Sequence, residues 1–403
     1  MSDENERLEH LYSHCLQDRL NVINKGQNSW IRRCGIDLLC KLLYLLLNSV
    51  GIRNSTKCLY VDEVNNSNMC GNLNKTAMIV HGKDATFLRM HSIDREGHFK
   101  TGITWTIAEL FKAIFFSIPA IFGYIASPKE VNESLLKILL FRMSQYVSRI
   151  SRDALCVLMS DHHFYSTIVA ETHNNSIVLQ HGLVQDIRFF SPVRASAICC
   201  WSAKSVKIID SKRGVDVGTY KFEIRRNVDR AGFTIDKIAR VLVCLSSSKT
   251  IDQIRFRMEP IISLKKRYGF TVLIKTHPGS FFSLSDLDSY QSMSGIELYK
   301  EEKIEDLDFD FAFVEQSTAV LDIACLGIPF IICDENESSY FTEYKKVIPT
   351  SKQQTDVIQL FETFNYELAF DGIRKLVENE INSGHCILGE YILDRCKENI
   401  DNY

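Results

Sequence analysis

The sequence predicts an α/β protein with two doubly wound parallel sheets. Short apolar runs alternate with stretches of helical periodicity over residues 154–209 and again over residues 240–333. Such alternation is typical of βαβ units, whose strands are parallel. The length of 403 residues suits two domains of ordinary size. A charged, weakly patterned stretch, residues 212–233, is predicted to connect them, which divides the chain into domains 1–225 and 226–403.

Composition narrows the class of protein. Hydrophobic residues make up 45% and charged residues 24%, so a sizeable core is expected, and the net charge of −3 gives no overall attraction to nucleic acid or anionic lipid. The 13 cysteines are odd in number and many lie in apolar runs, which favours reduced thiols over a disulfide or zinc framework. The polar, acidic start is unlike a secretory signal, so a cytoplasmic protein is predicted.

The N-terminal third is predicted to be mostly helical, with two short strands within it. Helices are expected over residues 5–50, 105–125 and 130–150, and strands over 57–61 and 77–80. The apolar stretch 105–126 contains Glu109, Lys112 and Pro119, so a buried or surface-docking helix is favoured over one that spans a membrane.

The two alternations are then assigned in order. The first predicts strands over 154–159, 176–179 and 197–201 and helices over 165–171 and 203–209, the latter capped by Ser202. The second predicts strands over 240–245, 270–274, 296–299, 311–314 and 330–333 and helices over 251–268 and 318–326. Gly327 suits the end of that last helix, because glycine readily adopts a left-handed conformation, and Pro329 prevents continuation. Further helices are expected at the C-terminus.

Polar groups follow the strands of the second domain at their carboxyl ends, where open α/β sheets bind ligands. Lys275 and His277, held by Pro278, offer a positive charge and a hydrogen-bond donor suited to phosphate. Glu315 precedes the pair Ser317-Thr318, whose hydroxyls open a helix where backbone N–H groups attract anions. The simpler alternatives are a loop histidine with a solvated lysine, and a helix cap. Ser246 and Ser247 follow the first strand of this domain, and two interpretations stay open for them: contact with the donor phosphate, or an ordinary polar loop.

The first domain offers a candidate base. Gln180-His181-Gly182 follows a predicted strand, and a histidine there suits proton abstraction near neutral pH, although a hydrogen-bonded structural histidine is the alternative. Gly182 would allow a tight turn or a close approach of substrate. Asp161 and His162 follow the preceding strand and could line the same cleft, but no further metal ligand lies at the usual spacing.

Several other classes lack support. The D-x-D motif Asp308-Phe309-Asp310 lies in an acidic stretch before a strand, so a solvated strand entry is favoured over a metal site. The sequence contains neither a P-loop nor G-x-G-x-x-G, which argues against ATPase and dinucleotide-binding functions. The basic cluster Arg225-Arg226 with Arg230 is too small to indicate nucleic-acid binding.

The order of these motifs resembles a known family. A strand ending in Lys275–Pro278, then a strand, Ser317-Thr318, a helix and Gly327-x-Pro329, resembles the C-terminal domain of bacterial GT-B-fold transferases. It is similar to the His-Pro and Ser-Ser/Thr signatures of sialyltransferases, polysialyltransferases and capsule Kdo transferases. Teichoic-acid glycerophosphotransferases share a similar layout. The resemblance covers roughly residues 150–345 and implies that these histidine, serine and threonine residues contact the phosphate of a CMP- or CDP-linked donor.

The first domain departs from the sialyltransferase pattern. Those enzymes often place an acidic pair before a glycine, whereas this chain has Gln180-His181-Gly182. This is closer to the His-Gly of the glycerophosphotransferases, where the histidine is the expected base.

Together the residues and the resemblance predict an inverting glycosyltransferase of bacterial capsule or O-antigen biosynthesis. Its two domains would face each other across a cleft in a GT-B fold with extra N-terminal helices. The favoured donor is a CMP-linked sugar acid, followed by a UDP-sugar, and the acceptor is a glycan or lipid-linked oligosaccharide at the inner membrane. No cofactor or metal is expected. The alternatives are a CDP-alcohol polyol-phosphate transferase, a sugar-nucleotide epimerase and a non-catalytic polysaccharide-assembly protein.

Overall fold

The structure is a computed structural model. It describes residues 57–62, 67–89, 154–160, 164–184, 193–209, 212–222, 233–245, 251–277, 287–299, 302–315, 317–333, 344, 347–351, 354–381 and 386–398. The helices predicted over 5–50, 105–125 and 130–150 lie outside these residues.

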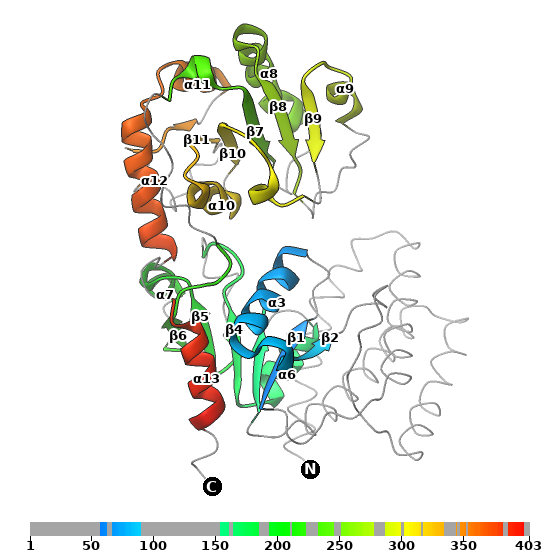
Figure 1. The fold of residues 1–403 in the computed structure, drawn as a ribbon, viewed down its shortest axis with the longest axis vertical. Coiled ribbons are helices and arrows are strands. Elements are labelled where there is room, and N and C mark those ends of the chain that lie inside the picture. Colours follow the sequence, from blue (N-terminus) through cyan, green and yellow to red (C-terminus); the bar gives the residue numbers. More distant parts are fainter. Residues whose placement is uncertain are drawn as a thin grey trace, which may run out of the picture.

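The first sheet has six parallel strands in the order β2-β1-β3-β4-β5-β6 (Figure 1). Its strands are β1 (Cys58–Asp62), β2 (Thr86–Arg89), β3 (Leu155–Leu158), β4 (Ser176–Leu179), β5 (Ala197–Cys200) and β6 (Gly214–Asp216). The helices of this part are α3 (Ser67–His81), α6 (Phe164–Thr172) and α7 (Ala203–Ile209), with a 3₁₀ turn at Gly82–Asp84.

The second sheet also has six parallel strands, in the order β12-β11-β10-β7-β8-β9. Its strands are β7 (Arg240–Cys244), β8 (Thr271–Lys275), β9 (Ile296–Tyr299), β10 (Phe311–Glu315), β11 (Phe330–Cys333) and β12 (Thr350–Ser351). The helices are α8 (Ile251–Tyr268), α9 (Asp288–Gln291), α10 (Ala319–Leu326), α11 (Gln354–Glu362) and α12 (Tyr366–Ile381), with 3₁₀ turns at Ile235–Lys237 and Ile304–Asp306; α13 (Leu388–Glu398) follows them and packs on the first sheet. Two doubly wound parallel sheets are therefore confirmed.

Two predicted assignments were wrong. The apolar run 77–80 belongs to helix α3 and not to a strand, because Leu73 and Ala77 are buried at helical spacing while Met78 and Ile79 are exposed. The stretch 212–233, predicted to be only a connection, contributes strand β6, which pairs with β5. A three-residue edge strand is too short to give a sequence signal of its own.

The second sheet is covered by helices on both faces. Along β10, Phe311 and Phe313 pack into one apolar cluster with residues of α8 and α11, whereas Ala312 and Val314 pack into another with α10 and α12. Successive residues of a strand point to opposite faces, so each face needs its own layer. This explains why the sequence shows continuous apolar runs and not polar–apolar alternation.

The chain returns to the first sheet at its C-terminal end. Helix α12 runs alongside the second sheet toward the first, and α13 then packs beside α3 (Figure 1). Leu388, Ile392 and Cys396 of α13 are buried in the same cluster as residues of β1 and β3. The division into domains 1–225 and 226–403 stays a prediction, and the first sheet takes a covering helix from beyond that boundary.

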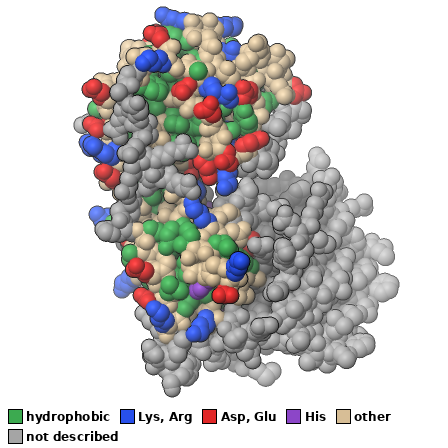
Figure 2. All heavy atoms as spheres, in the orientation of Figure 1, with side chains coloured by type: hydrophobic (Ala, Val, Ile, Leu, Met, Phe, Trp, Pro, Cys, Tyr) green, Lys and Arg blue, Asp and Glu red, His purple; other side chains and the backbone are tan. Residues whose placement is uncertain are grey.

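The described surface carries both signs of charge. On the face in Figure 2, basic and acidic side chains are interspersed over the coloured part of the molecule. Within the described residues, no helix combines the length and apolar character needed to cross a bilayer. The helix predicted over 105–126, buried or docked on a surface, lies outside those residues.

The end of α10 offers a test of local backbone geometry. Gly327 has φ 71°, and its N–H donates to the Ala324 carbonyl oxygen, as the predicted helix end requires. We expect Gly327→Ala to lower the free energy of unfolding by about 1–2 kcal/mol, because a Cβ is strained in the left-handed region. Urea unfolding followed by circular dichroism measures this.

Gly71→Ala is the matched control. Gly71 is exposed within α3, and a Cβ there meets no described atom within 4 Å. This variant should gain about 0.5–1 kcal/mol, because alanine suits a helix interior better than glycine. Equal effects of the two substitutions would contradict the assignment of Gly327 as a left-handed helix end.

Candidate functional site

The candidate residues of the second domain gather where the order of its strands reverses. The chain moves from β7 to β8 and β9 on one side of the sheet, and β10 to β12 lie on the other. The switch point is therefore between β7 and β10, and ligands of open α/β sheets bind outside the carboxyl ends of such strands. Glu315 ends β10 and Cys244 ends β7, so the residues that follow them flank this point.

Ser317 and Thr318 open helix α10 in different ways. The Ser317 Oγ accepts a hydrogen bond from the Ala319 N–H at 3.3 Å and so caps the helix in part. The Thr318 side chain makes no capping bond. Its Oγ1 accepts instead from the backbone N–H of Leu183, in the first domain, at 3.4 Å. The two hydroxyls therefore differ: that of Ser317 partly caps the helix, and that of Thr318 contacts the first domain.

The Gln180-His181-Gly182 segment lies directly against this helix start. A Cβ on Gly182 would stand 3.4 Å from the Thr318 Oγ1. Leu183 is buried in the apolar cluster that covers one face of the second sheet. Gly182 is not among the glycines with positive φ, so it does not form the left-handed tight turn that was one of the two expectations for it. The close approach is to Thr318, and half-buried His181 immediately precedes it.

Gln180 fixes the path of this segment through Trp201. The Gln180 side-chain oxygen accepts the backbone N–H of Trp201 at 2.9 Å, and the Gln180 backbone oxygen accepts the indole N–H at 2.8 Å. The Gln180 amide also donates to the Gly182 carbonyl oxygen at 2.9 Å. Both Gln180 and Trp201 are only 1% exposed, so these bonds form away from water, where leaving them unmade is costly.

Lys221 and Asp322 were not singled out from the sequence. The Lys221 ammonium lies 3.9 Å from an Asp322 carboxylate oxygen, 5.3 Å from the centre of the Trp201 ring and 4.8 Å from that of Phe222. Burial raises the pKa of Asp322, and the charge of Lys221 opposes this rise. Asp322 stands four residues after Thr318, which puts both residues on the same face of helix α10. This spacing was the signal in the sequence that could have identified Asp322.

Lys275 and His277 follow the neighbouring part of the sheet. Strand β7 separates β8 from β10, so the carboxyl ends of β8 and β10 are about 10 Å apart by ordinary strand spacing. His277 is exposed, and partial desolvation, then the charge of Lys275, lower its pKa. A neutral imidazole still offers one N–H donor at pH 7. Donors at β8 and at α10 can therefore contact different parts of one extended anionic ligand.

Two residues expected to line the cleft have buried side chains instead. Gln180 turns inward to Trp201, and Glu315 lies 3.8 Å from the guanidinium of Arg257, on α8, with both side chains at most 6% exposed. Each side chain points into the protein from the end of its strand and contacts a buried polar partner there. Both side chains are therefore engaged in contacts within the fold.

The other predicted site residues are placed as follows. Pro278, Asp161, His162, Ser246 and Ser247 lie outside the described residues. The D-x-D segment lies at the amino end of β10, opposite the end that carries the candidate site. The Asp310 carboxylate accepts hydrogen bonds there from the backbone N–H groups of Ala239 and Arg240, at 2.8 and 2.9 Å. This position at the start of β10 matches the structural interpretation of that motif.

Comparisons with known proteins show the fold. No family model matches the chain, and no curated protein matches its sequence. A putative UDP-N-acetylglucosamine 2-epimerase from Listeria monocytogenes is similar in structure, with 7% identity, a TM-score of 0.52 and coverage of 86% of this chain and 97% of that chain. The Neisseria meningitidis UDP-GlcNAc 2-epimerase bound to UDP-GlcNAc is also similar in structure, with 10% identity, a TM-score of 0.52 and coverage of 85% of this chain and 99% of that chain.

The wall teichoic acid polymerase TagF is a third structural neighbour, with 12% identity, a TM-score of 0.50 and coverage of 96% of this chain and 98% of that chain. At these identities the likeness concerns the fold, and the predicted GT-B arrangement of two Rossmann-like domains is confirmed.

Proposed function

We propose that this protein is an inverting glycosyltransferase of bacterial surface-polysaccharide biosynthesis, which transfers a sugar from a nucleotide-linked donor to a glycan hydroxyl. The observation that carries this proposal is the contact between the Leu183 N–H and the Thr318 Oγ1. It brings His181 of the first domain beside the N-terminus of α10 in the second. A base and an anion-binding helix start are the two parts that such a displacement needs.

In the proposed reaction His181 accepts the proton of the acceptor hydroxyl. The acceptor oxygen attacks the anomeric carbon, and the bond from that carbon to the donor phosphate breaks, its electron pair leaving with the phosphate oxygen. Lys275, His277 and the N-terminus of α10 with Ser317 and Thr318 stabilise the charge that develops there. Donors arranged in this way act on the leaving group more strongly in the transition state than in the substrate.

The donor follows from the sequence motifs. The first donor to test is a CMP-linked sugar acid of the sialic acid or Kdo type, because the His-Pro and Ser-Thr signatures resemble those of enzymes that use it. A UDP-sugar is the second. We propose a glycan or lipid-linked acceptor at the cytoplasmic side of the inner membrane.

A donor panel tests the function directly. The full chain is incubated with CMP-, UDP- and CDP-linked donors and a set of glycan acceptors, and products are identified by mass spectrometry. Release of the nucleotide with a matching increase in acceptor mass is the expected result. Transfer of a polyol phosphate from a CDP-alcohol would replace the proposal by its main alternative. Nucleotide binding without any product across the panel would favour an assembly protein.

His181→Ala should reduce turnover by at least 100-fold while donor affinity changes little, because general-base catalysis typically contributes 10²–10⁴-fold. Steady-state kinetics and calorimetric donor binding measure the two quantities. Added imidazole should restore part of the lost rate, since it can occupy the space of the missing ring. Retained turnover in the variant would remove His181 as the base.

Thr318→Val and Thr318→Ser form a matched pair. Valine keeps the shape but removes the oxygen that accepts the Leu183 N–H and faces the proposed phosphate, whereas serine keeps it. We expect the valine variant to bind donor roughly 10-fold more weakly, as loss of about 1.5 kcal/mol implies. The serine variant should bind within about two-fold of the original protein. Equal affinities of the two variants would show that the hydroxyl makes no contribution.

A further inference from the structure

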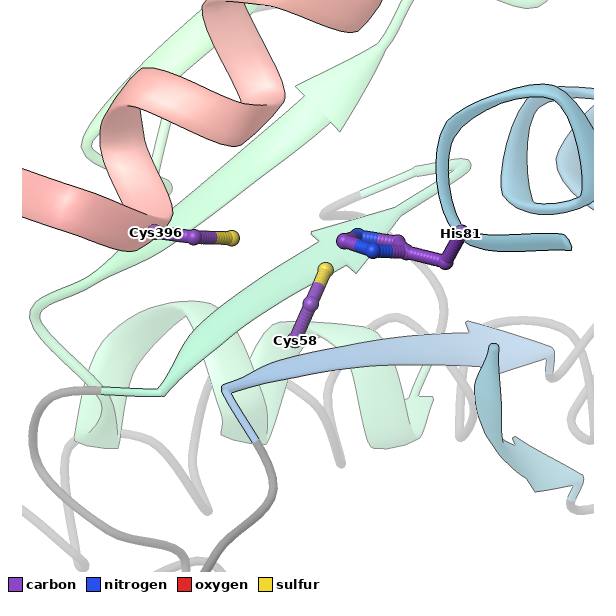
Figure 3. A group of neighbouring side chains, drawn as sticks. All are labelled: Cys58, His81 and Cys396. Atoms are coloured by element: carbon purple, nitrogen blue, oxygen red, sulfur yellow. The ribbon is translucent and has the colours of Figure 1, made fainter. Parts of the chain in front are cut away.

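Three potential metal ligands meet at the amino end of strand β1 in the first sheet, whereas the proposed active site lies at the carboxyl ends of the strands. Cys58 is the first residue of β1, His81 is the last of α3, and Cys396 lies near the end of α13. Their ligand atoms, two sulfurs and one imidazole nitrogen, all lie within 4.8 Å of one another. Figure 3 shows the three side chains pointing toward a common centre from three separate elements.

The centre is buried and its polar atoms are incompletely satisfied. Cys58 is 6% and Cys396 7% exposed. Among the described residues, the His81 Nε2 and the Tyr60 hydroxyl are buried and make no hydrogen bond of normal length and angle, and the polar atoms beside them are the sulfurs of Cys396 and Cys58. The Tyr60 ring meets the His81 ring edge-on, with centroids 5.8 Å apart. Buried polar atoms in native proteins nearly always have a partner, so two orphans beside a ligand cluster point to a missing ligand.

We propose that Cys58, His81 and Cys396 bind a Zn²⁺ ion. Thiolate and imidazole are the preferred ligands of zinc, and a Cys₂His set is among its common protein environments. Ligand atoms around tetrahedral zinc stand about 3.5–3.8 Å apart, given bond lengths of roughly 2.0–2.3 Å. The three side chains therefore need to close by only about 1 Å. Water would take the fourth position, with the Tyr60 hydroxyl as its hydrogen-bond partner.

A disulfide between Cys58 and Cys396 explains the site less well. It would consume both sulfurs and leave the imidazole nitrogen unsatisfied, whereas a metal ion engages all three ligands.

Three protein ligands and a water are also the pattern of catalytic zinc, but this centre is remote from the proposed active site, so we assign the ion a role in joining elements of the fold. Zinc here would join β1, α3 and α13, and α13 is the helix that returns from beyond the second sheet. His181 follows the carboxyl end of β4, whereas Cys58 begins the parallel strand β1, so the two sites lie at opposite ends of the strands of one sheet. The zinc site would secure the C-terminal helix on the first domain without contacting donor or acceptor.

Metal analysis of the full chain tests the proposal. The protein is purified under reducing conditions without chelator, and its zinc content is measured by inductively coupled plasma mass spectrometry. We expect close to one zinc per chain, and at least a ten-fold lower content in Cys58→Ser and in Cys396→Ser. Cys199→Ala is the control, because Cys199 is buried in the same apolar cluster but lies outside the metal-binding group. Its zinc content should be unchanged.

Cobalt and a variant pair at His81 keep the test independent of folding defects. Co²⁺ added to metal-free original protein should give the thiolate charge-transfer absorption of a tetrahedral site. His81→Cys should retain zinc because it supplies a third ligand, and His81→Phe, which keeps a ring against Tyr60, should bind at least ten-fold more weakly. Absence of both zinc and the cobalt absorption, or equal zinc content in the Cys58, Cys396 and Cys199 variants, would overturn the proposal.

Discussion

The hydrogen bonds between Gln180 and Trp201 are the interaction on which the proposed active site depends. They satisfy the backbone and side chain of Gln180 at once, in a place that is almost wholly buried. The chain leaving β4 therefore has one path, which carries Gly182 to the Thr318 hydroxyl and Leu183 into the apolar layer of the second sheet. Loss of the hydrogen bonds between Gln180 and Trp201 would move His181, the proposed base, away from the helix start that is proposed to bind the donor.

A charge pair adds to the contact between the two domains. Lys221 of the first domain lies beside the rings of Trp201 and Phe222 in the same domain, and its ammonium group faces the Asp322 carboxylate of the second. Beneath the surface, the buried ion pair of Arg257 and Glu315 holds the end of β10, just ahead of the two hydroxyl residues. Hinge motion between domains, if it accompanies donor binding, has to preserve or replace these contacts.

Sequence patterns predicted the strands and their carboxyl-terminal motifs well, because buried parallel strands produce apolar runs that need no knowledge of the rest of the chain. The left-handed end of α10 at Gly327 was predictable for the same local reason. The run 77–80 was assigned to a strand because its apolar residues are contiguous, and only burial shows that Met78 and Ile79 face outward. The buried side chains of Gln180 and Glu315 depend on Trp201 and Arg257, which are distant in sequence.

The sequence by itself determined two α/β sheets and the placing of His181, His277, Ser317 and Thr318 after their strands, since hydrophobic periodicity is a property of neighbouring residues. Tertiary structure decided which of these residues meet, because a hydrogen bond such as that from Leu183 to Thr318 depends on packing of one domain against the other. It also decided that Cys58, His81 and Cys396 share one centre. Their spacing along the chain matches no metal motif, and the return of α13 to the first sheet brings Cys396 to the other two residues.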